Sequence, residues 1–112
     1  MRHIDPSVIA EVREDMEEDF EDFVTCYLDD AERFVRLCGA AIAVADSAQL
    51  QFQAHALKSS SAYVGANELA ALAAGLEQLG AGGSVDGADD LHRQAVYVFE
   101  GVKSELEASV AA

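Results

Sequence analysis

Prolines, basic residues and long apolar runs are all scarce in this chain of 112 residues. Pro6 is the single proline, and no strand-like alternation of apolar and polar residues is sustained. No apolar run approaches the roughly 20 residues of a membrane-spanning helix, and the first residues lack a signal-peptide apolar region. Seven basic against 21 acidic residues give a net charge of −14, which argues against nucleic acid and anionic membranes. We therefore expect protein partners with a basic or mixed docking face.

Cysteine pairs, metal-ligand patterns and nucleotide-binding motifs are also missing. Cys26 and Cys38 are not in CxxC spacing, so we expect reduced, half-buried thiols and a cytoplasmic location. His3 and His92 have no second ligand at helical spacing, and the acidic run over 11–22 lacks the spaced ligands of a calcium loop. No glycine-rich phosphate loop or kinase signature is present. We expect no metal site, no cofactor and no ATP site.

Apolar residues recur at steps of three and four over most of the chain, which is typical of amphipathic helices. We expect a short helix over 6–16, four longer helices over 18–45, 47–63, 67–79 and 89–108, and a flexible loop over 80–87. Four long helices with short connections favour an all-α fold, an antiparallel four-helix bundle with a short additional N-terminal helix. One domain would span 1–112, and the start at Met1 favours a free-standing protein.

His55 lies in the most informative segment. A helix advances about 100° per residue, which places five residues on one core-facing stripe: Leu50, Ala54, Leu57, Ser61 and Val64. His55 is about 160° from Leu57 around the axis and therefore points outward. Phe52, Lys58, Ser59 and Ala62 share its outer face. An exposed imidazole beside a cation and small side chains is a site that a partner can reach and phosphorylate.

The segment resembles the signature of the histidine-containing phosphotransfer (HPt) family, His-x-Leu-Lys-Gly-Ser-Ser followed by a Gly-Ala pair. The matching residues are His55, Leu57, Lys58, Ser60, Ser61, Gly65 and Ala66. The sequence departs from the family at Ser59, where glycine is usual, and Tyr63 is bulkier than expected at its position. Serine is the next-smallest choice, so close approach by a partner should survive. The order and lengths of the expected helices agree with the HPt bundle.

The resemblance implies a phosphocarrier without enzymatic turnover. His55 would accept a phosphoryl group from a receiver-domain aspartate in a His-Asp phosphorelay and pass it to another receiver. Any Mg²⁺ would belong to the receiver. Lys58 would pair with the phosphoryl oxygens. In some HPt relatives a glutamate 22 residues after the histidine accepts a hydrogen bond from Nδ1, a role that falls here to Glu77.

Receiver domains of response regulators or hybrid histidine kinases are the partners that the resemblance implies, bound by a monomer. We expect them to dock on Phe52, Ser59, Ala62 and Tyr63, while Ser61 faces the core and bonds back to its own helix carbonyls. Two alternatives stay open. One is an adaptor on the same bundle that binds receivers without transfer, supported by Ser59 and Tyr63. The other is a bundle with a ligand or metal in its core, which needs inward polar ligands that the helical stripes lack.

Overall fold

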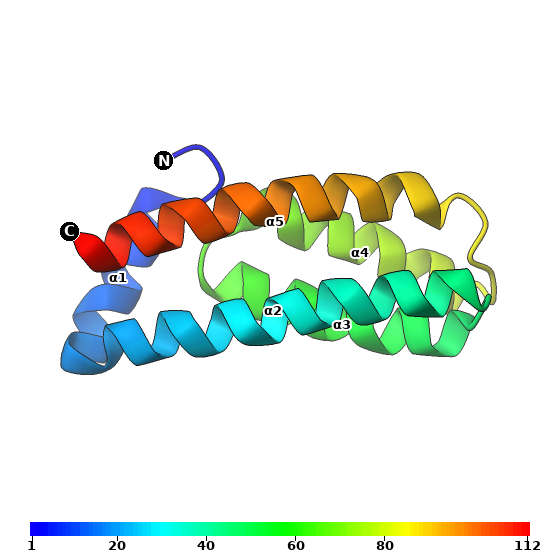
Figure 1. Ribbon diagram of the computed structural model, residues 1–112, viewed down its shortest axis with the longest axis horizontal. Coiled ribbons are helices and arrows are strands. Elements are labelled where there is room, and N and C mark those ends of the chain that lie inside the picture. The colour runs from blue at the N-terminus through cyan, green and yellow to red at the C-terminus, as the bar shows by residue number, and fades with distance from the viewer.

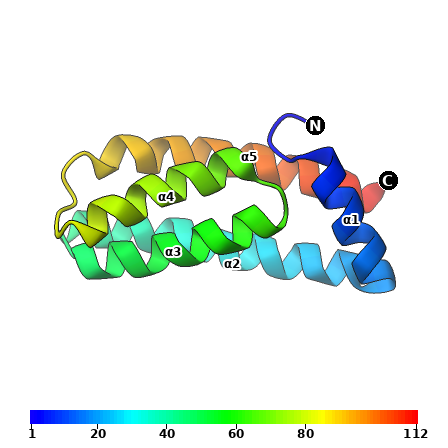
Figure 2. The same cartoon turned by 180° about the vertical axis from the view of Figure 1, so that it is seen from behind.

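Four long helices run antiparallel, and a short helix crosses one end of the bundle that they form (Figures 1 and 2). The computed structural model describes all 112 residues and contains no strand. The elements are α1 (Pro6–Met16), a 3₁₀ turn (Glu17–Asp19), α2 (Phe20–Ala43), α3 (Ser47–Tyr63), α4 (Asn67–Ala81) and α5 (Ala88–Ala111). The predicted all-α class and the four-helix bundle with its N-terminal helix are confirmed. No helix combines the length and apolar character needed to cross a membrane.

The helix bounds agree with the sequence-based expectation for α1 and α3 and differ elsewhere. Helix α2 begins two residues late because Glu17 takes a positive φ of 52° and the chain tightens into a 3₁₀ turn. It ends at Ala43, since Ala45 also has a positive φ of 56°. Helix α5 continues past Ala108 to Ala111, because Ser109 is buried and Val110 packs against the core. Helix α4 continues two residues past Leu79 to Ala81, so the glycine-rich loop is shorter than expected.

The core-facing stripe of α3 lies where helical periodicity predicts it. Five residues of this stripe are buried: Leu50, Ala54, Leu57, Ser61 and Val64. The expected bonding of Ser61 is wrong, because its Oγ lies 2.8 Å from the Tyr27 hydroxyl of α2. Ser60, at the half-buried edge of α3, bonds back instead, and its Oγ donates to Ala56 O over 2.9 Å. The buried hydroxyl pair of Tyr27 and Ser61 therefore links α2 to α3.

The two cysteines differ in environment. Cys38 is fully buried, and this burial raises the pKa of its thiol to about 11. Cys26 is exposed, so the expectation of two half-buried thiols is wrong. The difference follows from their places on α2, because Cys26 follows the core residue Val24 by two positions and so points away from the core. Both are free thiols.

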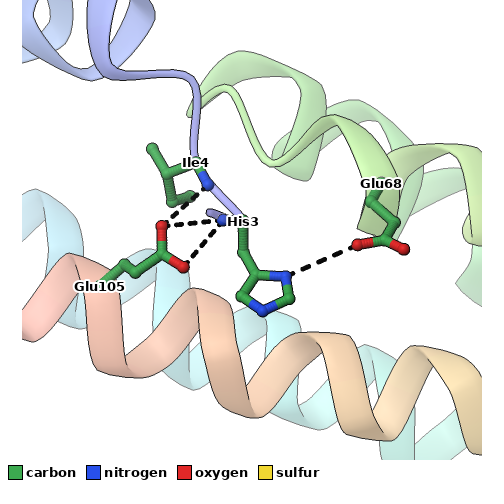
Figure 3. A network of polar contacts seen from close by, with 4 residues as sticks. All are labelled: His3, Ile4, Glu68 and Glu105. Atoms are coloured by element: carbon green, nitrogen blue, oxygen red, sulfur yellow. Dashed lines mark hydrogen bonds and ion pairs between the residues drawn. The ribbon is translucent and has the colours of Figure 1, made fainter. Parts of the chain in front are cut away.

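Residues before α1 are held against α5 by one carboxylate (Figure 3). Glu105 of α5 accepts hydrogen bonds from the backbone N–H of His3 at 2.8 Å and of Ile4 at 3.1 Å. The His3 ring packs over Gly101, and its Nδ1 lies 3.5 Å from a carboxylate oxygen of Glu68 on α4. The N-terminal segment is thus placed between α4 and α5 before α1 begins.

Gly65 ends α3 and fixes the position of α1. Its φ of 80° is left-handed, and the N–H groups of Gly65 and Ala66 donate to Ala62 O and Ser61 O over 3.1 and 2.9 Å. This arrangement is a Schellman motif. A Cβ on Gly65 would lie 2.9 Å from Val8 Cβ of α1, and Gly65 O accepts the N–H of Asp5 over 2.9 Å. Gly65 therefore satisfies both a turn and a close contact.

Gly65→Ala should lower the free energy of unfolding by about 2 kcal/mol or more, because strain at positive φ adds to a steric clash with Val8. Gly83→Ala is the matched control. Gly83 has the same φ of 80° with no atom within 4 Å of its would-be Cβ, so only the strain of about 1 kcal/mol should appear. Urea denaturation followed by circular dichroism measures both. Equal losses would contradict the packing role of Gly65.

Candidate functional site

His55 lies on the outer face of α3, at mid-length of the helix. Asp46 caps the start of α3 by accepting the N–H of Gln49 over 3.1 Å. The neighbours Ala54 and Leu57 are fully buried, which turns the intervening His55 to the surface. Its side chain is 61% exposed. A partner can therefore reach the imidazole without any rearrangement of the bundle.

Glu77 of α4 holds the imidazole from one side. Its Oε2 lies 2.6 Å from Nδ1 of His55, and its Oε1 lies 2.5 Å from Nζ of Lys58. The carboxylate thus bridges two residues of α3, and its side chain is only 19% exposed. The structure places Lys58 against Glu77, a contact that sequence reasoning missed because residues on different helices carry no periodic signal.

The ionised carboxylate decides which imidazole nitrogen carries the proton. Hydrogen bonds from Lys58 first, and from His55 second, lower the pKa of Glu77 below its ordinary value. An ionised carboxylate only accepts hydrogen bonds, so Nδ1 of His55 must be the donor. In the neutral imidazole this leaves the lone pair on Nε2, the nitrogen that is free to attack an incoming group.

The expected docking residues are all exposed, but they divide between two places. Phe52 is 66% exposed and lines a shallow hollow beside His55. Ser59 and Ala62 continue the same outer face of α3. The Tyr63 ring turns toward α2, where its centroid lies 5.7 Å from that of Phe23.

Beyond Tyr63 lies a mainly apolar groove that sequence reasoning did not identify. Met16, Phe23 and Cys26 line it together with Tyr63. Phe23 fits the spacing of three and four residues between the apolar side chains of α2, but periodicity alone does not distinguish a core residue from one that lines a surface groove. The groove therefore joins the Tyr63 end of α3 to the flank of α2.

The other two histidines serve helix packing. Nε2 of His92 lies 2.9 Å from Val35 O, and its ring packs over Gly39 of α2. His3 packs over Gly101 of α5. No group of three or more His, Cys, Asp or Glu side chains gathers where it could hold a metal ion. His55 is thus the one histidine whose ring is mostly exposed.

The model of the family described as Hpt domain matches residues 7–112. The chain belongs to the Hpt domain family. The crystal structure of histidine-containing phosphotransfer protein B (HptB) from Pseudomonas aeruginosa PAO1 is similar with a TM-score of 0.92 and 28% sequence identity. The similarity covers 96% of this chain and 94% of that chain. None of the curated proteins compared matches the sequence significantly. The resemblance seen in the sequence is confirmed, and the protein is an Hpt phosphocarrier of a phosphorelay.

Lys58→Met should raise the pKa of Glu77 toward its ordinary value, because the Lys58 ammonium is the main cause of the lowering. The pH dependence has a definite sign. Since the folded-state pKa is depressed, the stabilisation by this contact is present at neutral pH and is lost as pH falls through the lowered pKa. Carbon-13 NMR titration of the Glu77 carboxyl measures the change. Lys103→Met on α5 is the control, and an unchanged Glu77 titration in Lys58→Met would contradict the assignment.

Proposed function

We propose that His55 is the phosphorylated residue, accepting a phosphoryl group from a receiver-domain aspartate and passing it to another receiver. The observation that carries the proposal is the 2.6 Å contact between Nδ1 of the exposed His55 and Glu77. In the transfer, the lone pair of Nε2 forms a bond to phosphorus as the bond from phosphorus to the aspartate oxygen breaks. The aspartate leaves as a carboxylate, and the reverse step delivers the group onward.

Glu77 would stabilise the positive charge that the imidazole gains while the phosphoryl group is attached. The carboxylate already contacts Nδ1, so it needs no movement to act at the moment of transfer. Its limited exposure strengthens this interaction relative to one in open water. We regard Glu77 as the residue that orients His55 and keeps the attacking nitrogen unprotonated.

Lys58 would move from Glu77 to the phosphoryl oxygens. The Lys58 ammonium and the His55 ring both contact the Glu77 carboxylate, so the ammonium lies near the imidazole. The flexible lysine side chain can change its direction over this short distance. Such a partly exposed contact contributes roughly 1 kcal/mol. The exchange of partners would leave the negative phosphoryl group neutralised while Glu77 continues to bind the imidazole.

The phosphodonor in this proposal is a protein and not ATP, because the chain carries no recognisable ATP-binding motif. Docking would use Phe52, Ser59, Ala62 and Tyr63, all of which are exposed. The receivers of response regulators or hybrid histidine kinases are the partner class. With a net charge of −14, the protein favours receivers whose docking face is basic or mixed.

We further propose that residues 1–112 act as one monomeric domain in the cytoplasm. The segment before the family match is fixed to α5 by Glu105, which supports a single unit. The high negative charge opposes self-association. An exposed free thiol at Cys26 suits a reducing compartment.

His55→Gln should abolish phosphoryl transfer from a phosphorylated receiver and leave receiver binding intact. Glutamine keeps a polar side chain of similar reach but has no nucleophilic ring nitrogen. The label on the unmodified protein should be acid-labile and alkali-stable, as expected of a phosphoramidate. Circular dichroism controls for the fold. If the wild-type protein binds receivers but acquires no label, the adaptor function is favoured. If His55→Gln acquires label, the phosphorylated residue lies elsewhere.

Phe52→Ala should weaken receiver binding about tenfold, equivalent to about 1.4 kcal/mol, because a central exposed aromatic residue is lost from the docking surface. Tyr97→Ala is the matched control, since Tyr97 is an aromatic residue of α5 that is 74% exposed. Calorimetric titration with an unphosphorylated receiver measures both variants. Comparable losses in the two, or none in Phe52→Ala, would contradict docking beside His55.

A further inference from the structure

Helices α3 and α4 meet backbone to backbone at Gly80. A Cβ added at this buried glycine would lie 2.6 Å from both Gln51 N and Ser47 O, and 3.0 Å from Gln51 Cα. All three are main-chain atoms of α3, so no side chain can rotate to make room. Any larger residue at Gly80 must push the two helices apart at this level.

This contact lies one helical turn from the candidate phosphorylation site. Gly80 follows Glu77 by one turn on α4, and Gln51 precedes His55 by one turn on α3. The two helices are antiparallel (Figure 2). The contact of Gly80 with Gln51 is therefore followed, one turn along both helices, by the contact of Glu77 with His55. The spacing of the backbones at Gly80 therefore sets the gap that the Glu77 side chain must span to reach Nδ1.

We propose that Gly80 is a positioning residue for phosphotransfer, because it keeps α3 and α4 close enough for Glu77 to hold the His55 imidazole. The proposal rests on the function proposed above for His55. Oε2 of Glu77 lies 2.6 Å from Nδ1 of His55, and Lys58 binds the other carboxylate oxygen. The carboxylate therefore has little freedom to follow His55 if the helices separate. A hydrogen bond to oxygen weakens beyond about 3.2 Å, so a modest separation of the helices is enough to break it.

Gly80→Ala should slow transfer from a phosphorylated receiver to His55 roughly ten- to hundredfold, because the ring is no longer held with its attacking nitrogen free. Gly75→Ala is the matched control on the same helix. A Cβ there would lie 3.1 Å from Leu91 Cδ1 of α5, and no backbone atom of α3 lies within 4 Å of it. Both substitutions replace a helical glycine by a better helix former. Gly75→Ala should transfer at nearly the wild-type rate.

A double-mutant cycle separates positioning from general damage. In the Glu77→Gln background, Gly80→Ala should cause little further slowing, since the contact through which it acts is already weakened. An equally large slowing in that background would overturn the proposal. So would a wild-type transfer rate in Gly80→Ala, or an equal slowing in Gly75→Ala.

Nitrogen-15 NMR of the His55 ring provides a readout that does not depend on transfer. In the wild type the proton should reside on Nδ1, and in Gly80→Ala it should be shared between the two nitrogens. If wild-type protein is not labelled at His55, the proposed function fails, and the ring spectra still decide whether Gly80 positions Glu77. Should Gly80→Ala be partly unfolded, the measurements are repeated in sucrose, which favours the folded state. An unchanged Nδ1 signal in the refolded variant would then overturn the proposal.

Discussion

The close approach of α3 and α4 is the constraint on which the site depends. Gly80 of α4 lies against the α3 backbone, and each helix also buries an alanine, Ala54 on α3 and Ala73 on α4. Larger side chains there would hold the helices farther apart. A glutamate on one helix can then reach a histidine on the other only because so little lies between the backbones. The absence of a side chain at Gly80 is thus a geometric requirement of the site, while the alanines of both helices contribute helix propensity.

Charge is distributed unevenly between the site and the rest of the surface. The chain carries seven basic residues against 21 acidic ones, and one of these few cations, Lys58, lies beside His55. A phosphoryl group approaching this protein meets a strongly negative surface, so a local cation matters more here than on a neutral protein. In the proposed docking, the same negative surface would favour a receiver with basic residues around its docking face. The positive charge of Lys58 would therefore attract the phosphoryl group at short range, while the negative surface would select among receivers at longer range.

The periodicity of apolar residues predicted the helices well, but it does not predict which residues of different helices come into contact. The bounds of α1 and α3, the buried stripe of α3 and the exposure of His55 all follow from spacing along the chain. The pairing of Glu77 with His55 came from the family resemblance. The contact of Lys58 with Glu77, and the bond of Ser61 to Tyr27, depend on how whole helices are rotated against each other. The spacing of residues along a single sequence holds no signal for such rotations.

A relay residue must be reactive in both directions, and the contacts of His55 suit that requirement in the proposed transfer. If the site bound the phosphoryl group tightly, transfer onward would be slow, because ground-state stabilisation raises the barrier to leaving. Glu77 contacts Nδ1 of the imidazole, so in the proposed transfer it would favour both the attacking ring and the charged ring that follows. The half-exposed Lys58 would add only a weak, screened attraction. Orientation by a held carboxylate and weak binding by a mobile cation together suit a carrier that both accepts and releases.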